Sequence, residues 1–161
     1  MIKKLFLILF FLNIATNSYS AGSDSTTSKV KSDYDKAVES IKFAKKFEKK
    51  GKIKKAMKRY TKAQKLLLKS NTKKPNQADT LNYLGFSTRK LGDYENGEKY
   101  YLLGLKIDPN HNGINEYLGE LYVQTNQIDK ANERLEVLRN CNCDEFNELE
   151  LIIKTRGTKI Y

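Results

Sequence analysis

Two cysteines, one histidine and a pair of carboxylates are the side chains of this sequence whose types and spacing could support chemistry. Cys141 and Cys143 are one residue apart, so a disulfide between them would close a very small loop. His111 is the only histidine, and Glu116 and Glu120 are spaced to share one face of a helix, where such pairs are usually solvated. No nucleophile motif, phosphate-binding glycine loop or metal-ligand spacing accompanies them. The sequence therefore predicts a protein that is not an enzyme and uses no metal or cofactor.

The N-terminus has the pattern of an export signal. A basic start precedes the apolar run 5–12, and Ser18 and Ser20 place small residues before a cut. The run is too short to span a bilayer, for which roughly 20 residues are needed. We expect 1–20 to be a signal peptide cleaved after Ser20, although an uncleaved anchor is the alternative. The Ser/Thr/Gly-rich segment 21–32 predicts a flexible leader, and the mature protein is expected to be periplasmic.

Charge is distributed unevenly along the chain. Residues 29–74 contain 18 Lys and Arg against 4 Asp and Glu, a net charge of +14, whereas residues 75–161 contain 10 against 14, a net charge of −4. The whole chain carries +11. The sequence therefore predicts a protein with one strongly basic end and one mildly acidic end.

An internal repeat of 34 residues organises the second half of the chain. Leu84 and Gly85 recur 34 residues later as Leu118 and Gly119, with apolar neighbours at helical spacing. The same interval relates three further pairs, which are Gly92 and Asn126, Tyr94 and Ile128, and Tyr101 and Leu135. A period of this length with two helices per unit predicts stacked helical hairpins.

The turn residues agree with this period. Gly92 stands where the first helix of a hairpin must reverse, because glycine tolerates a positive φ. Asp93 follows as a helix cap, and Asp108 with Pro109 ends the second helix. Asn126 occupies the turn position of the next unit and is the next best residue for that conformation.

These motifs resemble the tetratricopeptide repeat (TPR) family, and in particular small exported bacterial members with a cysteine pair before a C-terminal capping helix. The resemblance rests on the segments Leu81–Gly85, Gly92–Tyr94, Tyr100–Tyr101 and Asp108–Asn110. It implies an all-α, right-handed α-solenoid of about three helical hairpins plus a capping helix. The implied segments are a divergent basic unit at 33–69, a linking loop at 70–77, units at 78–111 and 112–143, a capping helix at 144–155 and a tail at 156–161.

The chain departs from the family pattern at several core positions. Ser40 and Asn115 fill a slot that usually holds a large apolar residue, and Thr88 replaces an aromatic one. Gly97 and Gly104 replace better helix formers, each at an expected cost of about 0.5–1 kcal/mol relative to alanine. These departures predict local weakness without changing the fold.

The resemblance also implies a binding groove, lined by the first helix of each unit. The groove residues would be Lys45, Lys49, Asn82, Phe86, Arg89, Lys90, Glu116, Glu120 and Gln124. Because their charges change from basic to acidic along the groove, we expect it to bind an extended peptide or a partner helix with complementary ends. The predicted function is a protein-interaction scaffold of the cell envelope, with no small-molecule substrate.

Two other functions remain open. A basic surface could bind an anionic membrane or envelope polymer electrostatically. Its lysines would be Lys42, Lys46, Lys52, Lys54, Lys55, Lys58 and Lys62. Nucleic acid is not expected as a partner, because an exported protein is separated from the nucleic acid of the cell. Cys141 and Cys143 could instead exchange a disulfide with other thiols, although the resemblance favours a structural pair that shapes the turn before the capping helix.

Overall fold

The structure is a computed structural model that describes residues 31–158. Over that range it is all-α, without strands. The helices are α1 (Asp33–Glu48), α2 (Ile53–Lys73), α3 (Ala78–Lys90), α4 (Tyr94–Ile107), α5 (Asn112–Gln124), α6 (Ile128–Leu138) and α7 (Asp144–Lys154). None of these helices has both the length and the apolarity needed to cross a bilayer. The predicted signal peptide 1–20 and the leader as far as residue 30 lie outside the described residues.

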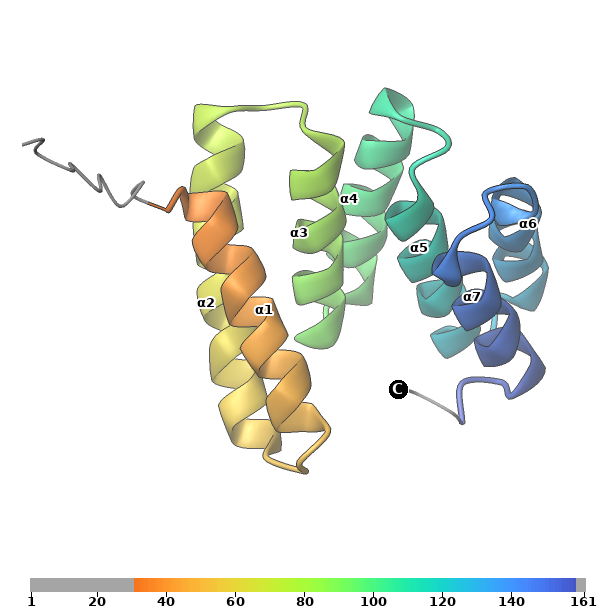
Figure 1. The fold of residues 1–161 in the computed structure, drawn as a ribbon, viewed down its shortest axis with the longest axis horizontal. Coiled ribbons are helices and arrows are strands. Elements are labelled where there is room, and N and C mark those ends of the chain that lie inside the picture. Colours follow the sequence, from red (N-terminus) through yellow and green to blue (C-terminus); the bar gives the residue numbers. More distant parts are fainter. Residues whose placement is uncertain (1–30, 159–161) are drawn as a thin grey trace, which may run out of the picture.

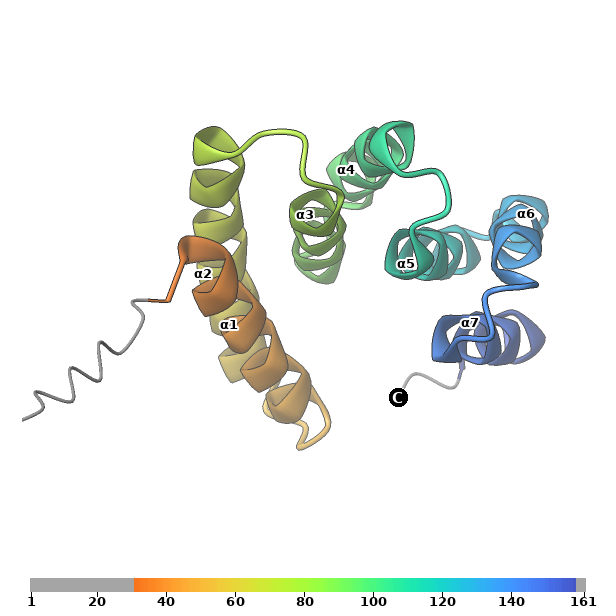
Figure 2. The same ribbon diagram turned by 45° about the horizontal axis from the view of Figure 1, so that its top comes forward.

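The helices form three successive hairpins, α1–α2, α3–α4 and α5–α6, followed by α7 (Figure 1). Helices α1, α3, α5 and α7 follow one another along one side of the array, and α2, α4 and α6 lie behind them (Figure 2). Contacts between α1 and α3, α3 and α5, and α5 and α7 join these helices. The predicted all-α solenoid of helical hairpins with a capping helix is confirmed.

Two of the hairpin turns use the residues that the sequence predicted for them. Gly92 and Asn126 have φ values of 93° and 59°, in the left-handed region that favours glycine and asparagine, and Gly51 between α1 and α2 has a φ of 66°. Asp93 caps α4, since its side chain accepts a hydrogen bond of 3.1 Å from the backbone N–H of Asn96. Local sequence therefore determines where each hairpin reverses.

The predicted linking loop at 70–77 is wrong in its first half, because α2 continues to Lys73. No glycine or proline lies between the start of α2 and Pro75, and the Thr72 hydroxyl donates to the Leu68 carbonyl one turn earlier. Pro75 disfavours the helical region for Lys74, whose φ of −137° and ψ of 86° end the helix. The first half of the predicted loop thus belongs to α2, which is 21 residues long.

The glycines inside α4 allow close packing between helices. A Cβ atom added at Gly97 would lie 3.3 Å from the backbone of α3, and one added at Gly104 would overlap the Ile114 side chain. Gly85 of α3 has the same function, since an added Cβ would lie 2.5 Å from the Tyr101 ring. Gly97 and Gly104 therefore lower the helix propensity of α4, but they allow the neighbouring helices to lie closer to it.

The polar residues at predicted core positions are buried and hydrogen bonded. The Ser40 hydroxyl donates to the carbonyl of Arg59 at 2.9 Å, and Gln64 donates to the Thr88 hydroxyl at 2.9 Å. The Asn115 amide donates to two carbonyls in the loop before α5. Since each of these groups has a partner, the departures do not leave unpaired polar atoms in the core.

Helix α7 covers the last hairpin. Leu149 and Ile152 are buried, and a Cβ added at Gly119 of α5 would lie 2.6 Å from Leu149. The backbone N–H of Gly157, with φ of 74°, donates to Ile152 and closes the end of the helix. The predicted tail 156–161 therefore begins with a helix-terminating turn, and residues 159–161 lie outside the described range.

Candidate functional site

A pocket of about 190 Å³ lies on the surface shared by α1, α3, α5 and α7, and we call it the central pocket. Its lining residues are Lys45, Glu48, Lys49, Phe86, Lys90, Tyr117, Glu120 and Glu148. Five of them, namely Lys45, Lys49, Phe86, Lys90 and Glu120, belong to the predicted groove. The structure therefore brings together predicted residues from all three hairpins at one depression.

Two aromatic rings and a lysine form the floor of the central pocket. The ring centroids of Phe86 and Tyr117 are 4.8 Å apart. The Lys45 ammonium lies 4.8 Å from the Phe86 centroid and donates a 3.1 Å hydrogen bond to the Tyr117 hydroxyl. Phe86 is only 3% exposed, and Lys45 is one of the side chains that cover its ring.

A second set of polar contacts forms the wall next to α1. Lys90 pairs with Glu48 at 3.0 Å, and the Tyr60 hydroxyl donates to the other Glu48 oxygen at 2.7 Å. Burial and the Glu48 carboxylate raise the pKa of Tyr60, so this hydroxyl stays protonated. Glu48 is thus fixed by two donors from different helices.

Arg89 and Glu120 form a buried ion pair between α3 and α5. They are 2% and 6% exposed, with 2.5 Å between Arg89 Nη2 and Glu120 Oε2. Arg89 also donates to Gln124 at 3.0 Å. Burial alone would lower the pKa of Arg89, but the Glu120 carboxylate and the Tyr101 hydroxyl together outweigh it and raise the pKa. The predicted groove charges at 89 and 120 therefore neutralise each other inside the molecule.

The other two predicted groove residues, Asn82 and Glu116, line a separate depression near the N-terminal ends of α3 and α5. We call this depression of about 470 Å³ the acidic pocket, because Asp79, Asp108, Glu116 and Glu145 line it. Glu116 is buried, whereas the sequence favoured a solvated carboxylate. The predicted groove residues therefore line two depressions that adjoin at Tyr117, and Glu120 of the buried ion pair lines the central pocket.

The seven lysines of the predicted basic surface are all exposed. Lys42 and Lys46 lie on α1, Lys52 lies in the following turn, and the other four lie on α2. Among the ion pairs in residues 31–158, none involves these lysines. They form a positive surface on the first hairpin, outside the lining of the central pocket.

Cys141 and Cys143 form a disulfide with 5.2 Å between their Cα atoms, within the range usual for such bonds. The intervening Asn142 has a positive φ of 49°. Cys143 is the cap residue that precedes α7. The sequence left the pairing open, and the structure places the bond at the turn into the capping helix.

Sequence reasoning missed three residues of the central pocket, which are Glu48, Tyr117 and Glu148. Glu48 is the only acid between Lys42 and Lys58, and this negative charge among lysines is the signal by which the sequence could have identified it. Glu148 lies on α7, within the predicted capping helix at 144–155. Because α7 follows α5 on the same side of the array, Glu148 extends the lining of the pocket.

The stacked hairpins, the closely packed glycines and the covering helix define a helical-repeat protein. Residues 78–111 match the model of the tetratricopeptide repeat family. That match covers the second of the predicted units. No curated protein sequence matches the chain.

Solved structures with the same fold include a chaperone of the Yersinia enterocolitica type III secretion system, SycD. The crystal structure of SycD with a peptide of the translocator YopD has a TM-score of 0.52 and 18% identity, covering 74% of this chain and 88% of that chain. An alternative SycD dimer has a TM-score of 0.53 and 19% identity, covering 80% and 92%. At these identities the similarity shows the fold alone.

Proposed function

We propose that this protein is a non-enzymatic interaction scaffold that binds a peptide or a helix of a partner protein across the central pocket. The observation that carries the proposal is the convergence of four helices on one depression with an aromatic floor and charges of both signs. Aromatic anchors surrounded by polar groups are typical of protein-binding surfaces. The similarity to SycD, which was solved with a translocator peptide, supports the same kind of ligand.

The charges around the pocket favour a partner segment that carries both signs. Glu48 and Glu120 already pair with Lys90 and Arg89. Lys49 is exposed and Glu148 is half-buried at the rim, so both can meet charges of a ligand. Such pairs contribute more to specificity and association rate than to affinity.

Crosslinking in cells tests the proposal. A photoreactive phenylalanine analogue at position 49 or 148 is expected to form adducts with the same partner, which mass spectrometry then identifies. Phe86 is too deeply buried for this probe. The matched control is position 99, an exposed lysine on α4 outside the pocket lining. Equal adducts from position 99, or none from the two rim positions, would contradict the proposal.

The proposed place of action is the cell envelope. It rests on the basic start, the apolar run and the small residues of segment 1–20. N-terminal sequencing of the protein purified from its own cells is expected to begin at Ala21, and fractionation to place it in the periplasm. An intact Met1 in a cytoplasmic fraction would contradict export.

A second candidate function is electrostatic attachment to an anionic membrane surface. The exposed and unpaired lysines of the first hairpin favour it, since each can contribute about 1 kcal/mol near such a surface. Co-sedimentation with anionic vesicles is expected to fall with added salt and with Lys54, Lys55 and Lys58 changed to glutamine. The matched control changes Lys106, Lys130 and Lys154. No sedimentation at low salt would rule this function out.

A further inference from the structure

We propose that the acidic pocket binds a lysine or arginine side chain of the peptide that crosses the central pocket. The inference rests on the proposed function, because it assigns one end of the same ligand. Tyr117 lines both depressions, so a segment lying on the Phe86–Tyr117 floor enters the acidic pocket directly. A cationic residue of the partner would therefore define the direction in which the peptide lies.

The charge of the acidic pocket is strongly negative. Four carboxylates line it, and no lysine or arginine does, in a chain with 30 basic residues against 19 acidic ones. The local sign thus opposes the sign of the whole protein. Burial together with the charges of Glu116 and Glu120 raises the pKa of Tyr117, which is consistent with a negative potential at the junction of the two pockets.

The histidine in the acidic pocket is held by contacts within the protein. His111 Nδ1 accepts a hydrogen bond of 3.2 Å from the backbone N–H of Ile114 and thereby caps α5. Since Nδ1 is an acceptor, the ring proton is on Nε2, which donates to Asp79 at 3.1 Å. Both nitrogens of the His111 ring therefore have partners within the protein.

A buried acceptor without a partner points to a ligand that donates hydrogen bonds. Asn82 is 5% exposed and lines the acidic pocket, and its side-chain oxygen has no hydrogen-bond partner in the described residues. A half-turn of the amide exchanges its oxygen and nitrogen, so either can face the pocket. A Cβ added at Gly113 would lie 2.8 Å from the Asn82 nitrogen. The glycine therefore keeps the approach to this amide open.

The shape of the site favours an organic cation over a metal ion. Within residues 31–158, no three His, Cys, Asp or Glu side chains converge closely enough to hold a metal. The carboxylates instead surround a space of about 470 Å³, which suits an ammonium or guanidinium group with its alkyl stem. Tyr83 and Tyr117 also line the space, and aromatic faces attract such cations.

The helix dipoles do not reverse this preference. First-turn residues of three helices line the pocket, namely Asp79 of α3, Gly113 of α5 and Glu145 of α7, and each helix N-terminus carries a partial charge of about +0.5. Three such ends contribute about +1.5 in total, which is less than the charge that four lining carboxylates can carry. The net field therefore attracts a cation.

Nuclear magnetic resonance of the isotope-labelled protein tests this inference with a defined probe. The probe is N-acetyl-lysine methylamide, and its matched control is the norleucine compound, which has the alkyl stem without the ammonium. The lysine compound is expected to shift the signals of Asn82 and Gly113 and the norleucine compound to leave them unchanged. Changing Asp79 to asparagine together with Glu145 to glutamine is expected to weaken lysine binding by about tenfold, because a net charge-assisted contact is lost.

The control variant changes Glu95 to glutamine and Asp129 to asparagine, two exposed acids elsewhere, and is expected to bind the probe like the wild type. Equal shifts with norleucine, or unchanged lysine binding by the Asp79 and Glu145 variant, would overturn the inference. The probe is one residue long and does not depend on the natural partner. A partner crosslinked at the rim without lysine binding therefore removes this inference alone, and lysine binding without crosslinks removes the scaffold proposal alone.

Discussion

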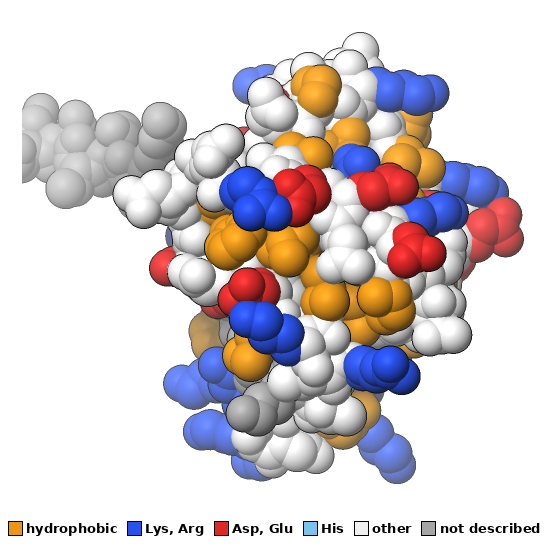
Figure 3. All heavy atoms as spheres, turned by 90° about the vertical axis from the view of Figure 1, so that its right-hand side faces the viewer, with side chains coloured by type: hydrophobic (Ala, Val, Ile, Leu, Met, Phe, Trp, Pro, Cys, Tyr) orange, Lys and Arg blue, Asp and Glu red, His pale blue; other side chains and the backbone are white. Residues whose placement is uncertain are grey.

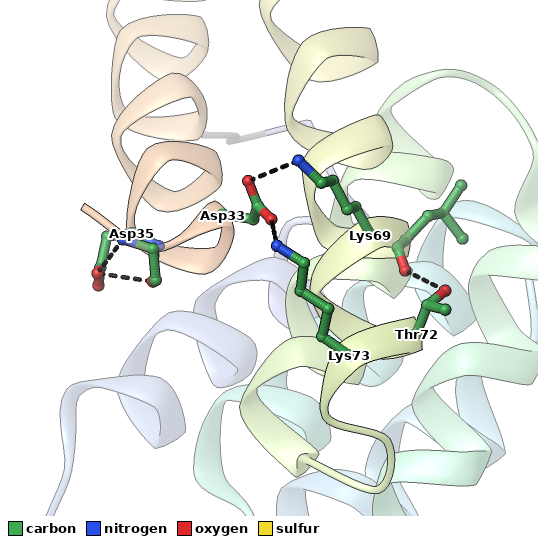
Figure 4. Close-up of polar contacts among 7 residues, drawn as sticks. Asp33, Asp35, Lys69, Thr72 and Lys73 are labelled. Atoms are coloured by element: carbon green, nitrogen blue, oxygen red, sulfur yellow. Dashed lines mark hydrogen bonds and ion pairs between the residues drawn. The ribbon is translucent and has the colours of Figure 1, made fainter. Parts of the chain in front are cut away.

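At the N-terminal end of the solenoid, α1 and α2 form a long hairpin with a lysine-rich outer surface, whereas at the C-terminal end the short helix α7 covers the last hairpin. Asp33 joins the ends of α1 and α2 through Lys69 at 3.5 Å and Lys73 at 2.7 Å, in contacts near the surface (Figure 4). At the other end, Leu149 and Ile152 are buried. Both ends have an apolar core, but the outermost contacts are ionic at the N-terminal end and apolar at the C-terminal end.

This difference reflects what each end would expose without its closing contacts. The first hairpin has a lysine-rich surface that also exposes Phe43, Ile53 and Leu68, and it meets water without a further helix. The last hairpin presents Gly119 and its apolar neighbours, which α7 removes from solvent. The cover is partial, since Val137 and Leu151 are exposed and hydrophobic side chains remain visible on this end beside charged ones (Figure 3). We therefore expect the apolar contacts to dominate stability at this end.

The largest effect is expected for Leu149→Ala. This side chain is fully buried against α5, and its truncation leaves a cavity that typically costs ~2–5 kcal/mol. Urea unfolding monitored by circular dichroism measures the loss. The matched control is Leu68→Ala at the other end, an exposed leucine of α2 whose change is expected to stay within about 0.5 kcal/mol. Equal losses from the two variants would remove the contrast between the ends.

Gly85→Ala and Gly119→Ala test whether the packing of α7 at the C-terminal end adjusts to an added methyl group more easily than the packing between interior helices. At Gly85 the new methyl group meets the Tyr101 ring, which is enclosed, and overpacking of this kind costs ~1–3 kcal/mol. At Gly119 it meets the flexible end of Leu149, so α7 can move outward. We expect the larger loss of unfolding free energy for Gly85→Ala. The reverse order would mean that α7 is held as rigidly as the interior helices.

Replacing Cys141 and Cys143 by serine tests what the disulfide adds at the C-terminal end. A loop this small restricts the unfolded chain little, so the loss is expected to be about 1.5 kcal/mol or less. Differential scanning calorimetry with and without reductant measures it. A cellular phenotype that is lost while this stability is retained would instead favour thiol–disulfide exchange. An unchanged phenotype would end that alternative.

The sequence was sufficient for the features that depend on local conformation or on the repeat. Gly92, Asp93 and Asn126 were predicted at the turns they occupy, because backbone conformation restricts those positions to a few residue types. Helix α7 was predicted as the capping helix at 144–155 that the resemblance implies. The interval of 34 residues then placed the hairpins in order.

What the sequence did not show depends on distances between helices. Arg89 and Glu120 were predicted as charges of a groove, yet their shared burial follows only once α3 and α5 are packed. The length of α2 was missed because the polar residues in its last turn resemble a loop. In the structure Lys73 of that turn pairs with Asp33, the first residue of α1. Pairwise contacts across the fold, unlike turns, leave no local pattern in the chain.

The smallest effect is expected for Asp33→Asn at the N-terminal end. The hydrogen bond from Lys73 is the main cause that lowers the pKa of Asp33, and the charge of Lys69 adds to it. Because the pKa in the folded protein is below that of the unfolded chain, about 3.9, the contact stabilises above that pH. This stabilisation is lost as the pH falls through the lowered pKa. Wild type and variant should therefore differ in urea unfolding at neutral pH and converge in acid.

Added salt sharpens this last test. It screens contacts near the surface, so it should also reduce the difference between wild type and Asp33→Asn. Leu149→Ala is the control, because apolar burial has no charge to titrate or screen, and its deficit should persist in acid and in salt. If the deficit of Asp33→Asn also persisted in acid and in salt, the contribution of Asp33 would not be ionic. Apolar packing would then have to explain the stability of both ends.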